Sequence, residues 1–181
     1  MTRTIYYTAM TLDGFVADPG DSLDWLLRQD HDAAGPFGFD AFLPTVGAAV
    51  MGSTTYGWIL GHEDGAWPYT YPTWVLSSRE LPKVDGDVRF ARGDVRPVHE
   101  QLVAAADDRD VWVIGGGDLA GQFADAGLLD EVVASITPVT LGAGAPVLPR
   151  RLDLRLEETA RNRAFVCARY TVLGTLTEDR T

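Results

Sequence analysis

The chain has 181 residues, of which 46% are hydrophobic, and its formal net charge is −11 at pH 7. This length suits one domain with a sizeable core, and the acidic balance, with Lys83 as the only lysine, argues against binding to nucleic acid or to an anionic membrane. The single cysteine, Cys167, excludes an internal disulfide and a cysteine-based zinc site, and no apolar run is long enough to span a membrane. We expect a cytoplasmic protein that binds no metal, since its three histidines are scattered along the chain.

The first third of the chain alternates strand patterns with short helical ones. β-Branched and aromatic residues at 4–10 predict a first strand, and a short extended piece is expected at 15–17 after a turn. Ser22 can cap a short helix that ends at Leu27, and residues 35–44 are expected to be irregular or to form a short helix. Residues 46–51 predict a second, buried strand, followed by a glycine turn and a helix that Ser53 or Thr54 would cap.

The rest of the chain continues the alternation and ends in a hairpin. Strands are expected at 74–76, 88–91, 110–114 and 132–136, and apolar residues at helical spacing predict a helix over 95–106. Residues 140–149 are expected to form a loop. Alternation of apolar and polar residues at 152–156 and 166–172 predicts an antiparallel hairpin joined near Arg161 and Asn162. Together these patterns predict an α/β fold with a mixed, mostly parallel sheet and helices on both faces, followed by a polar tail at 176–181.

The stretch from Asp110 to Phe123 carries the strongest functional signal. A buried strand runs into the three glycines at 115–117 and a helical pattern follows, which is a geometry that holds a phosphate on free backbone N–H groups. A tight turn without a ligand is the alternative. The spacing of Gly115, Gly117 and Ala120 fits a dinucleotide fingerprint loosely, but the acidic residue expected about 20 positions further on is missing, so a standard Rossmann domain is not indicated.

Two other predicted strands end in turns that are rich in glycine or hydroxyl residues, at 52–55 and at 76–79. Ligands of open α/β sheets bind outside the carboxyl ends of the strands. The three turns together therefore predict a nucleotide site along one edge of the sheet.

Four segments, in this order, resemble those of the dihydrofolate reductase-like superfamily: 9–17, 50–56, 75–79 and 113–118. The run from Leu141 to Pro146, with Gly142 and Gly144 inside it, makes the chain most similar to the reductase domain of the bifunctional riboflavin-biosynthesis deaminase–reductase. The resemblance covers about residues 3–173. It implies one three-layer α/β domain over residues 1–175 with a C-terminal antiparallel hairpin.

The resemblance also implies that NADPH binds along the carboxyl edge of the sheet. Residues 115–117 and the helix that they open would hold the pyrophosphate, 52–55 a phosphate, and 76–79 the adenosine ribose with its 2′-phosphate, while Ala9, Val16 and Ala17 would face the nicotinamide. The expected cofactor-binding residues are Ala9, Val16, Ala17, Gly52, Ser53, Thr54, Thr55, Leu76, Ser77, Ser78, Arg79, Ile114, Gly115, Gly116, Gly117, Asp118 and Leu119. The family often has arginine where this chain has Ser53, which leaves the choice between NADPH and NADH open unless Arg79 or Arg92 compensates.

The function implied by the resemblance is hydride transfer from NADPH to a small pyrimidine- or pterin-type heterocycle, as in 5-amino-6-(5-phosphoribosylamino)uracil reductase. Asp13 and Asp24 are the candidate catalytic residues, which would orient a ring nitrogen, and Trp25 or Trp67 is a candidate to stack on the ring. A non-catalytic nucleotide-binding protein is one alternative. Dihydrofolate reductase itself is another, although it has an aromatic residue where this chain has Ala120. The resemblance further implies a homodimer.

Overall fold

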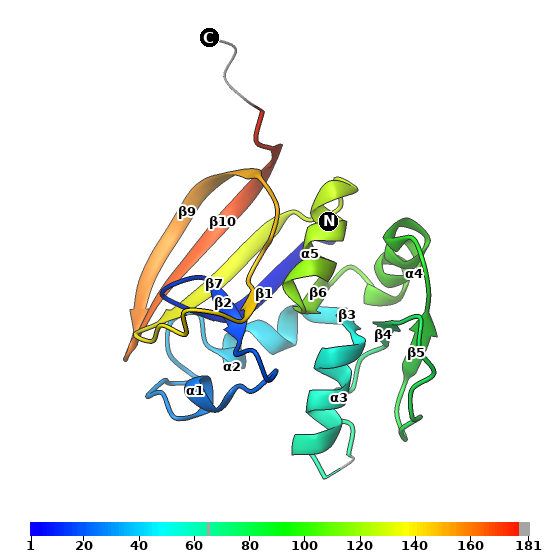
Figure 1. Cartoon of the computed structure of the whole chain (residues 1–181). Helices are drawn as coiled ribbons and strands as arrows, with labels where there is room; N and C mark the ends of the chain where they lie inside the picture. The colour runs from blue at the N-terminus through cyan, green and yellow to red at the C-terminus, as the bar shows by residue number, and fades with distance from the viewer. Residues whose placement is uncertain (65, 178–181) are drawn as a thin grey trace.

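A sheet of eight strands organises the chain, which the computed structural model describes over residues 1–64 and 66–177 (Figure 1). The strand order is β5-β4-β3-β6-β1-β7-β10-β9. Neighbours are parallel from β5 to β7, whereas β10 runs antiparallel to both β7 and β9. The strands are β1 (Thr4–Thr11), β3 (Val46–Gly52), β4 (Thr73–Leu76), β5 (Val88–Ala91), β6 (Asp110–Gly115), β7 (Glu131–Thr137), β9 (Leu152–Asn162) and β10 (Phe165–Thr175). The predicted mixed, mostly parallel sheet with a C-terminal antiparallel hairpin is confirmed.

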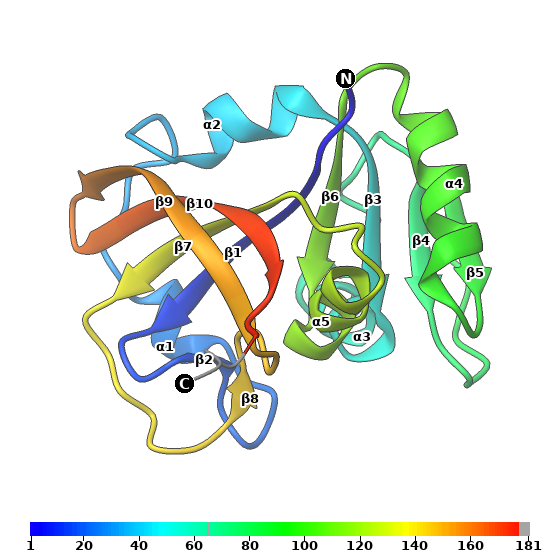
Figure 2. The same ribbon diagram turned by 90° about the horizontal axis from the view of Figure 1, so that it is seen from above.

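Helices cover both faces of this sheet, as predicted (Figure 2). They are α1 (Asp24–Leu27), α2 (Phe39–Phe42), the 3-10 helix η1 (Leu43–Thr45), α3 (Ser53–His62), α4 (Val95–Ala106) and α5 (Gly117–Asp125). Leu102 of α4 and Phe123 of α5 pack into one core with Val50 and Val113. Helices α2 and α3 pack on the opposite face. No helix within the described residues has the length and apolar character needed to cross a membrane.

The central strands are apolar on both faces because both faces are covered. In β3 the residues from Val46 to Met51 are all buried, and side chains of alternate residues enter opposite cores, Val50 that of α4 and α5, Met51 that of α3. Burial on both faces removes the alternation that marks a half-exposed strand. The amphipathic helix α4 instead turns a single stripe to the sheet, with Val98 and Leu102 buried.

Several local predictions need correction. Residues 140–149 are not only loop, because Ala145–Pro146 forms β8, which pairs with β2 (Phe15–Ala17) in a second, two-stranded sheet. The hairpin turn lies at Arg163 and Ala164, since β9 extends through Asn162. Leu23 is the N-cap of α1, although the Ser22 hydroxyl accepts a hydrogen bond from the Asp24 N–H at 3.1 Å. Of the predicted polar tail, residues 178–181 lie outside the described residues.

Candidate functional site

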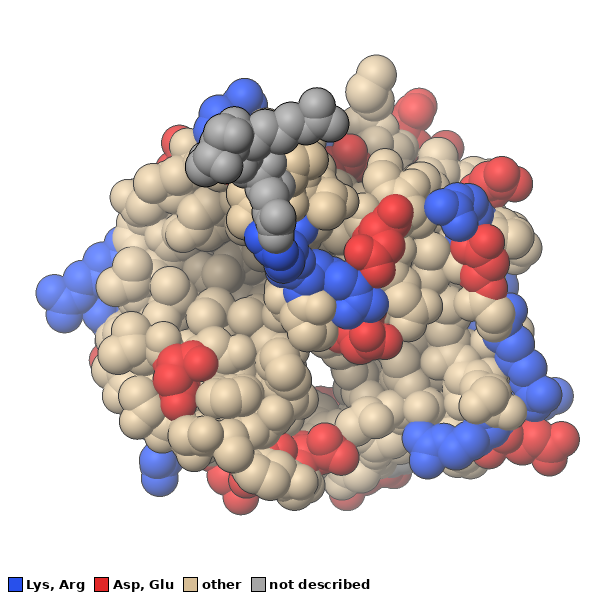
Figure 3. Space-filling view, turned by 45° about the horizontal axis from the view of Figure 1, so that its top comes forward, with Lys and Arg blue, Asp and Glu red and all other residues tan. Residues whose placement is uncertain are grey.

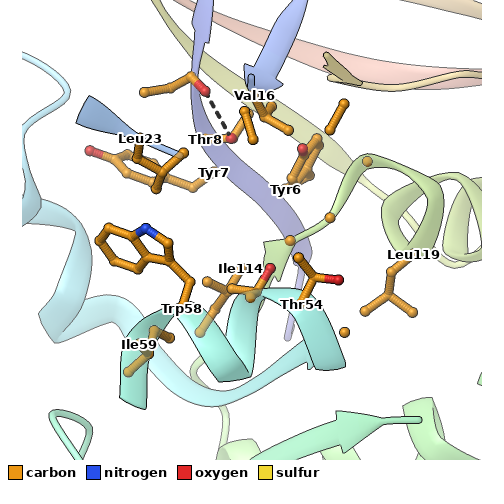
Figure 4. A pocket seen from close by; sticks show the side chains of 18 of the residues that line it. Tyr6, Tyr7, Thr8, Val16, Leu23, Thr54, Trp58, Ile59, Ile114 and Leu119 are labelled. Atoms are coloured by element: carbon orange, nitrogen blue, oxygen red, sulfur yellow. Dashed lines mark hydrogen bonds between the residues drawn. The ribbon is translucent and has the colours of Figure 1, made fainter. Parts of the chain in front are cut away.

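A cavity of about 930 Å³ opens near the carboxyl ends of β1, β3, β4 and β6 (Figure 4). Its two ends differ in chemistry. On one side of Figure 4 lie Tyr6, Thr54 and Leu119, next to the first turns of α3 and α5, and we refer to this part with the turn after β4 as the glycine end. On the other side lie Tyr7 and Trp58. We call this second part the aromatic end; its rings and leucines belong to Tyr7, Leu23, Leu26, Leu27, His31, Phe37, Phe39, Trp58, Tyr69, Trp112 and Phe165.

Two helices begin at the glycine end, one after each of two neighbouring strands. Strands β3 and β6 are paired in parallel, with Met51 opposite Gly115, so the starts of α3 and α5 lie on the same edge of the sheet. The N-cap residues are Gly52 and Gly116, and within the described residues no side chain caps either helix. The prediction that Ser53 or Thr54 caps α3 is therefore wrong. Uncapped first turns leave backbone N–H groups free to bind an anion, which the helix dipole also favours.

The three glycines where β6 meets α5 differ in what a side chain would meet at each position. Gly115 has φ of +157°, a conformation that side-chain-bearing residues rarely adopt. A Cβ on Gly117 would overlap the carbonyl oxygens of Pro146 and Val147, so this glycine lets the β8 segment approach α5. A Cβ on Gly116 would meet no atom within 4 Å, and one on Gly52 would find its nearest neighbour at 3.9 Å. The space beside Gly52 and Gly116 is therefore cavity rather than protein.

The turn after β4 supplies the positively charged side chain of the glycine end. Leu76, Ser77 and Ser78 line the cavity. Arg79 does not line it, but its guanidinium donates a hydrogen bond to Ser53 Oγ at 2.7 Å, and its backbone N–H bonds Ser77 Oγ at 3.0 Å. The guanidinium is thereby held at the rim, beside the start of α3.

Asp118 lies in the first turn of α5, where its charge would repel an anion. Its carboxylate accepts hydrogen bonds from Gln122 at 2.9 Å and from Arg150 at 3.0 Å, and both partners lower its pKa. A ligand phosphate can therefore use the backbone N–H of Asp118 but not its side chain. Ile114 and Leu119, on either side of the glycines, also line the cavity.

The Tyr6 hydroxyl is an orphaned polar group in the wall of the cavity. The residue is 0% exposed, and its oxygen has no hydrogen-bond partner among the described residues. Burial raises the pKa of Tyr6 to about 12, and the neighbouring Thr8 hydroxyl offsets part of that rise. Five buried side chains have such an unpartnered atom, and Tyr6 alone of the five lines the cavity. Leaving a buried hydroxyl unpaired costs free energy, which a polar ligand atom can recover.

The remaining expected cofactor residues, Ala9, Val16 and Ala17, lie between the two ends. All three line the cavity, Ala9 from β1 and the other two from β2. Strand β2 is held there by β8 and by a hydrogen bond of 2.9 Å from the Val147 N–H to the Gly14 carbonyl. Apart from Arg79, all the expected cofactor residues border this one cavity.

The two candidate catalytic carboxylates are not among the lining residues. Asp13 ties two loops together: its carboxylate accepts hydrogen bonds from the Thr11 hydroxyl at 2.6 Å and from the backbone N–H groups of Gly142 at 2.7 Å and Leu141 at 3.1 Å. These bonds lower the pKa of Asp13, the one from Thr11 most. Asp24 is exposed in α1. Neither Trp25 nor Trp67, the rings considered for stacking, lines the cavity.

The aromatic end was missed by the sequence analysis because its members come from distant segments. Tyr7 packs against Phe39 with ring centroids 5.2 Å apart and against Trp112 at 6.2 Å. Trp58 enters from α3, and Phe165 from β10, where it stacks on His31 at 5.7 Å. No local motif joins these residues. Their only signal in the sequence was an aromatic content of 10%, which does not distinguish a site from a core.

Comparison with known proteins agrees with the fold. Residues 68–166, more than half of the chain, match the model of the RibD C-terminal domain. An uncharacterized protein of Bacillus subtilis, YwjB, is 29% identical over 161 residues, which are 87% of this chain and 90% of that protein. A crystal structure from Shewanella sp. PV-4, assigned by name to riboflavin biosynthesis, is similar with a TM-score of 0.80 and 27% identity over 94% of this chain and 99% of the other.

Dihydrofolate reductase from Enterococcus faecalis, solved in complex with NADP(H), shares the fold, with a TM-score of 0.58 at 15% identity over 94% of this chain and 96% of that enzyme. The fold expected from the sequence segments is thus confirmed as dihydrofolate reductase-like. The matched model, which spans β4 to the start of β10, includes the glycine turn and half of the cavity wall. The chain belongs to the RibD C-terminal domain family.

Proposed function

We propose that this protein is an NADPH-dependent reductase, with the pyrophosphate of the cofactor at the glycine end and its nicotinamide next to Ala9 and Val16. The observation that carries the proposal is the pair of uncapped helix starts, at Gly52 and Gly116, that open into one cavity. Two such starts on neighbouring strands supply the backbone N–H donors that a pyrophosphate requires. The reductase-like family and fold support the same assignment.

The residues present fit the cofactor. The space beside Gly52 and Gly116, which a Cβ would enter without touching protein, leaves room for phosphate oxygens to approach the backbone. Tyr6, whose hydroxyl is unpartnered, also lines this cavity, and a ribose or carboxamide oxygen that reached the hydroxyl would accept a hydrogen bond from it. Both features are explained by a bound polar ligand, and neither by packing within the protein.

Arg79 is the residue that would favour NADPH over NADH. Its guanidinium, held against Ser53 Oγ at 2.7 Å, lies beside the serines of the turn after β4. A guanidinium matches the geometry of a phosphate and keeps its charge at all relevant pH values. In this proposal Arg79 binds the 2′-phosphate in place of the arginine that the family often has at position 53.

When bound, NADPH supplies a hydride to an electrophilic carbon of the substrate. The protein would position the reacting groups: Ala9 and Val16 would hold the nicotinamide, and the aromatic end would hold the substrate. Solvent at the open mouth provides the proton that completes the reduction. Since Asp13 and Asp24 do not line the cavity, we give neither a role in this step.

A titration of NADPH followed by tryptophan fluorescence tests the proposal, because Trp58 and Trp112 both line the cavity. We expect a saturable change, and oxidation of NADPH, seen as loss of its absorbance, when a flat electrophilic ring compound is added. No saturable signal and no heat in calorimetry would contradict cofactor binding. Tight binding without oxidation by any pterin, pyrimidine or quinone would instead favour the non-catalytic alternative.

A further inference from the structure

The aromatic end of the cavity presents a surface of rings and leucines to whatever binds there. Two of its residues remain exposed at the mouth, Leu27 by 59% and Phe39 by 40%. Exposed apolar side chains that border a cavity are typical of a ligand-binding groove. In the middle of this end, Tyr7, Phe39 and Trp112 contact one another, with the Phe39 and Trp112 rings 6.1 Å apart. Such a wall favours a flat, apolar partner.

Three polar side chains that line this end, those of Tyr7, Trp112 and Asn162, are already bonded to protein. The Tyr7 hydroxyl donates to the Phe37 carbonyl at 2.7 Å, and the Trp112 indole N–H donates to the Tyr7 carbonyl at 3.1 Å. The Asn162 amide donates to the carbonyls of Asp32 and Pro36, and its oxygen accepts from the Asp32 N–H at 2.9 Å. These groups have little capacity left for a polar substrate, because a bond to a ligand would replace one that exists.

The charges at this end are unfavourable for an anion. Among the lining residues in the described part of the chain the acidic ones are Asp21, Glu63 and, at the glycine end, Asp118; none is lysine or arginine, and the only basic one is His31. Arg169 lies over the ring of Phe37 at 5.6 Å and pairs with Glu158, so it borders the smaller cavity beyond that ring. Arg163 pairs with Asp30 and Asp32. In Figure 3, acidic side chains lie above and below the hollow near the middle of the face, and basic side chains lie beside the upper ones.

From these three observations we infer that the substrate is a flat, uncharged ring system that carries no phosphate. The inference rests on the proposed function and restricts the class of substrate that the reductase would accept. A phosphoribosyl-substituted pyrimidine would bring a phosphate dianion into this end of the cavity or to its mouth. A dianion taken out of water without a cationic partner costs far more free energy than an apolar wall returns. At the rim of the glycine end, where we place the cofactor, this cavity has the cation of Arg79. Its aromatic end has rings instead.

The proposed reduction needs no reactant other than NADPH, the substrate and water. The hydride carries an electron pair to the electrophilic carbon of a C=O, C=N or activated C=C bond. A proton from water adds to the other atom of that bond, and the nicotinamide leaves oxidised. The aromatic end contributes the stacking surface, and recognition depends on shape and not on charge.

A matched pair of probes tests the inference: naphthol and naphthyl phosphate, which share one flat ring system and differ by the phosphate. Binding is measured by calorimetry on the whole protein, with and without saturating NADPH. We expect naphthol to bind at least about tenfold more tightly than its phosphate ester. Phe39→Ala should weaken naphthol binding about fivefold, since it removes apolar contact area at the mouth. Val103→Ala, at an exposed position of α4 away from the cavity, is the matched control and should bind both probes as the wild type does.

A second variant is expected to gain binding, a result that a loss of fold could not produce. Leu27→Arg adds a cation at an exposed position of the mouth, so it should improve binding of naphthyl phosphate relative to naphthol by about tenfold. Equal or tighter binding of the phosphate ester by the wild type would overturn the inference, as would binding of neither probe. A protein that binds naphthol but shows no fluorescence response to NADPH would contradict the proposed function and leave the probe comparison intact.

Discussion

Arg79 Nη2 donates a hydrogen bond of 2.7 Å to Ser53 Oγ, which ties the turn after β4 to the first residue of α3. The bond places a guanidinium where the family often has an arginine on the helix itself. A phosphate that reaches this rim would meet Arg79 and the N–H groups of α3 together. In our proposal, a preference for NADPH over NADH would therefore depend on a residue 26 positions away from the one that the resemblance points to.

We expect Arg79→Gln to weaken NADPH binding by about tenfold and NADH binding by less than about twofold, because only NADPH has the 2′-phosphate. Isotherms for both nucleotides on the wild type and the variant check this. Arg89→Gln, on β5 and paired with Asp87 outside the cavity, is the control. An equal loss for the two nucleotides would show that Arg79 acts on the structure of the turn and not on the 2′-phosphate.

Gly116 and Gly117 differ in what a methyl group would meet, so alanine substitutions separate ligand space from packing. Gly116 has φ of −84° and ψ of −176°, extended backbone, and open space beside it. We expect Gly116→Ala to remain folded and to bind NADPH about tenfold more weakly, since the methyl group occupies the place of a phosphate oxygen.

Gly117→Ala should instead lower the free energy of unfolding by about 1–3 kcal/mol, because its methyl group overlaps the carbonyls of Pro146 and Val147. Urea unfolding and NADPH isotherms on both variants check the pair. Unchanged affinity in a folded Gly116→Ala protein would mean that the phosphates lie elsewhere.

The prediction of the fold from sequence succeeded where one segment contains its own signal. Strands β3 and β6 are buried on both faces and therefore read as unbroken apolar runs, and glycine turns mark their ends. Helix α4 was found by the spacing of Val98 and Leu102. Strand β8 was missed because two residues, one of them proline, form a strand only through pairing with β2.

The candidate site shows the same limit. The glycine end was predicted because Gly52 and the residues at 115–117 belong to local strand–turn–helix units. The aromatic end depends on Tyr7, Phe39 and Trp112 meeting across the sheet, which no local pattern encodes. Asp13 was chosen as a catalytic candidate for its place in a matching segment, yet its carboxylate is used by backbone N–H groups of a loop about 130 residues away.

The stability of the protein should fall between about pH 7 and pH 5 because of His99. Its Nε2 lies 2.8 Å from Thr4 Oγ1, and burial lowers its pKa, outweighing the opposite effects of Asp130 and Glu100. As the pH falls through about 6.5, His99 takes up a proton in the unfolded chain but not yet in the folded chain. Unfolding therefore becomes more favourable. Urea unfolding at both pH values measures the change.

His99→Gln, which cannot titrate, should show a smaller decrease over that interval. Carboxylates with a lowered pKa, such as Asp94 and Asp118, lose their stabilising effect only at more acidic pH, below about 4. They therefore do not contribute to the difference between the wild type and the variant from pH 7 to pH 5. An equal decrease in the wild type and the variant would exclude His99 as the cause.

We propose a homodimer, as the family resemblance implies, and assign its contact to the β9–β10 hairpin. Strand β9 is at the edge of the sheet, and Leu156 and Val166 of the hairpin are exposed by 55% and 56%. An unpaired edge with apolar side chains is suited to association with a second copy. Sedimentation at micromolar concentration should give the mass of two chains, and Leu156→Asp should shift it toward one. A wild-type protein that sediments as a single chain would contradict the dimer.

Tyr6 and Tyr71 provide a matched test of the cofactor site. Both are buried tyrosines whose hydroxyls have no partner among the described residues, and burial raises the pKa of both. Only Tyr6 lines the cavity. Replacement of either by phenylalanine removes an unsatisfied polar atom, so neither Tyr6→Phe nor Tyr71→Phe should lower the free energy of unfolding of the protein without ligand.

Their effects on NADPH should differ. Tyr6→Phe deletes a hydrogen bond that forms only in the complex, and we expect affinity to fall about three- to tenfold, whereas Tyr71→Phe should leave it unchanged. Urea unfolding without ligand and NADPH isotherms on both variants measure the two quantities. The decisive pattern is a loss of affinity without a loss of stability in Tyr6→Phe alone. Equal affinities for the two variants would mean that water, and not the cofactor, satisfies the Tyr6 hydroxyl.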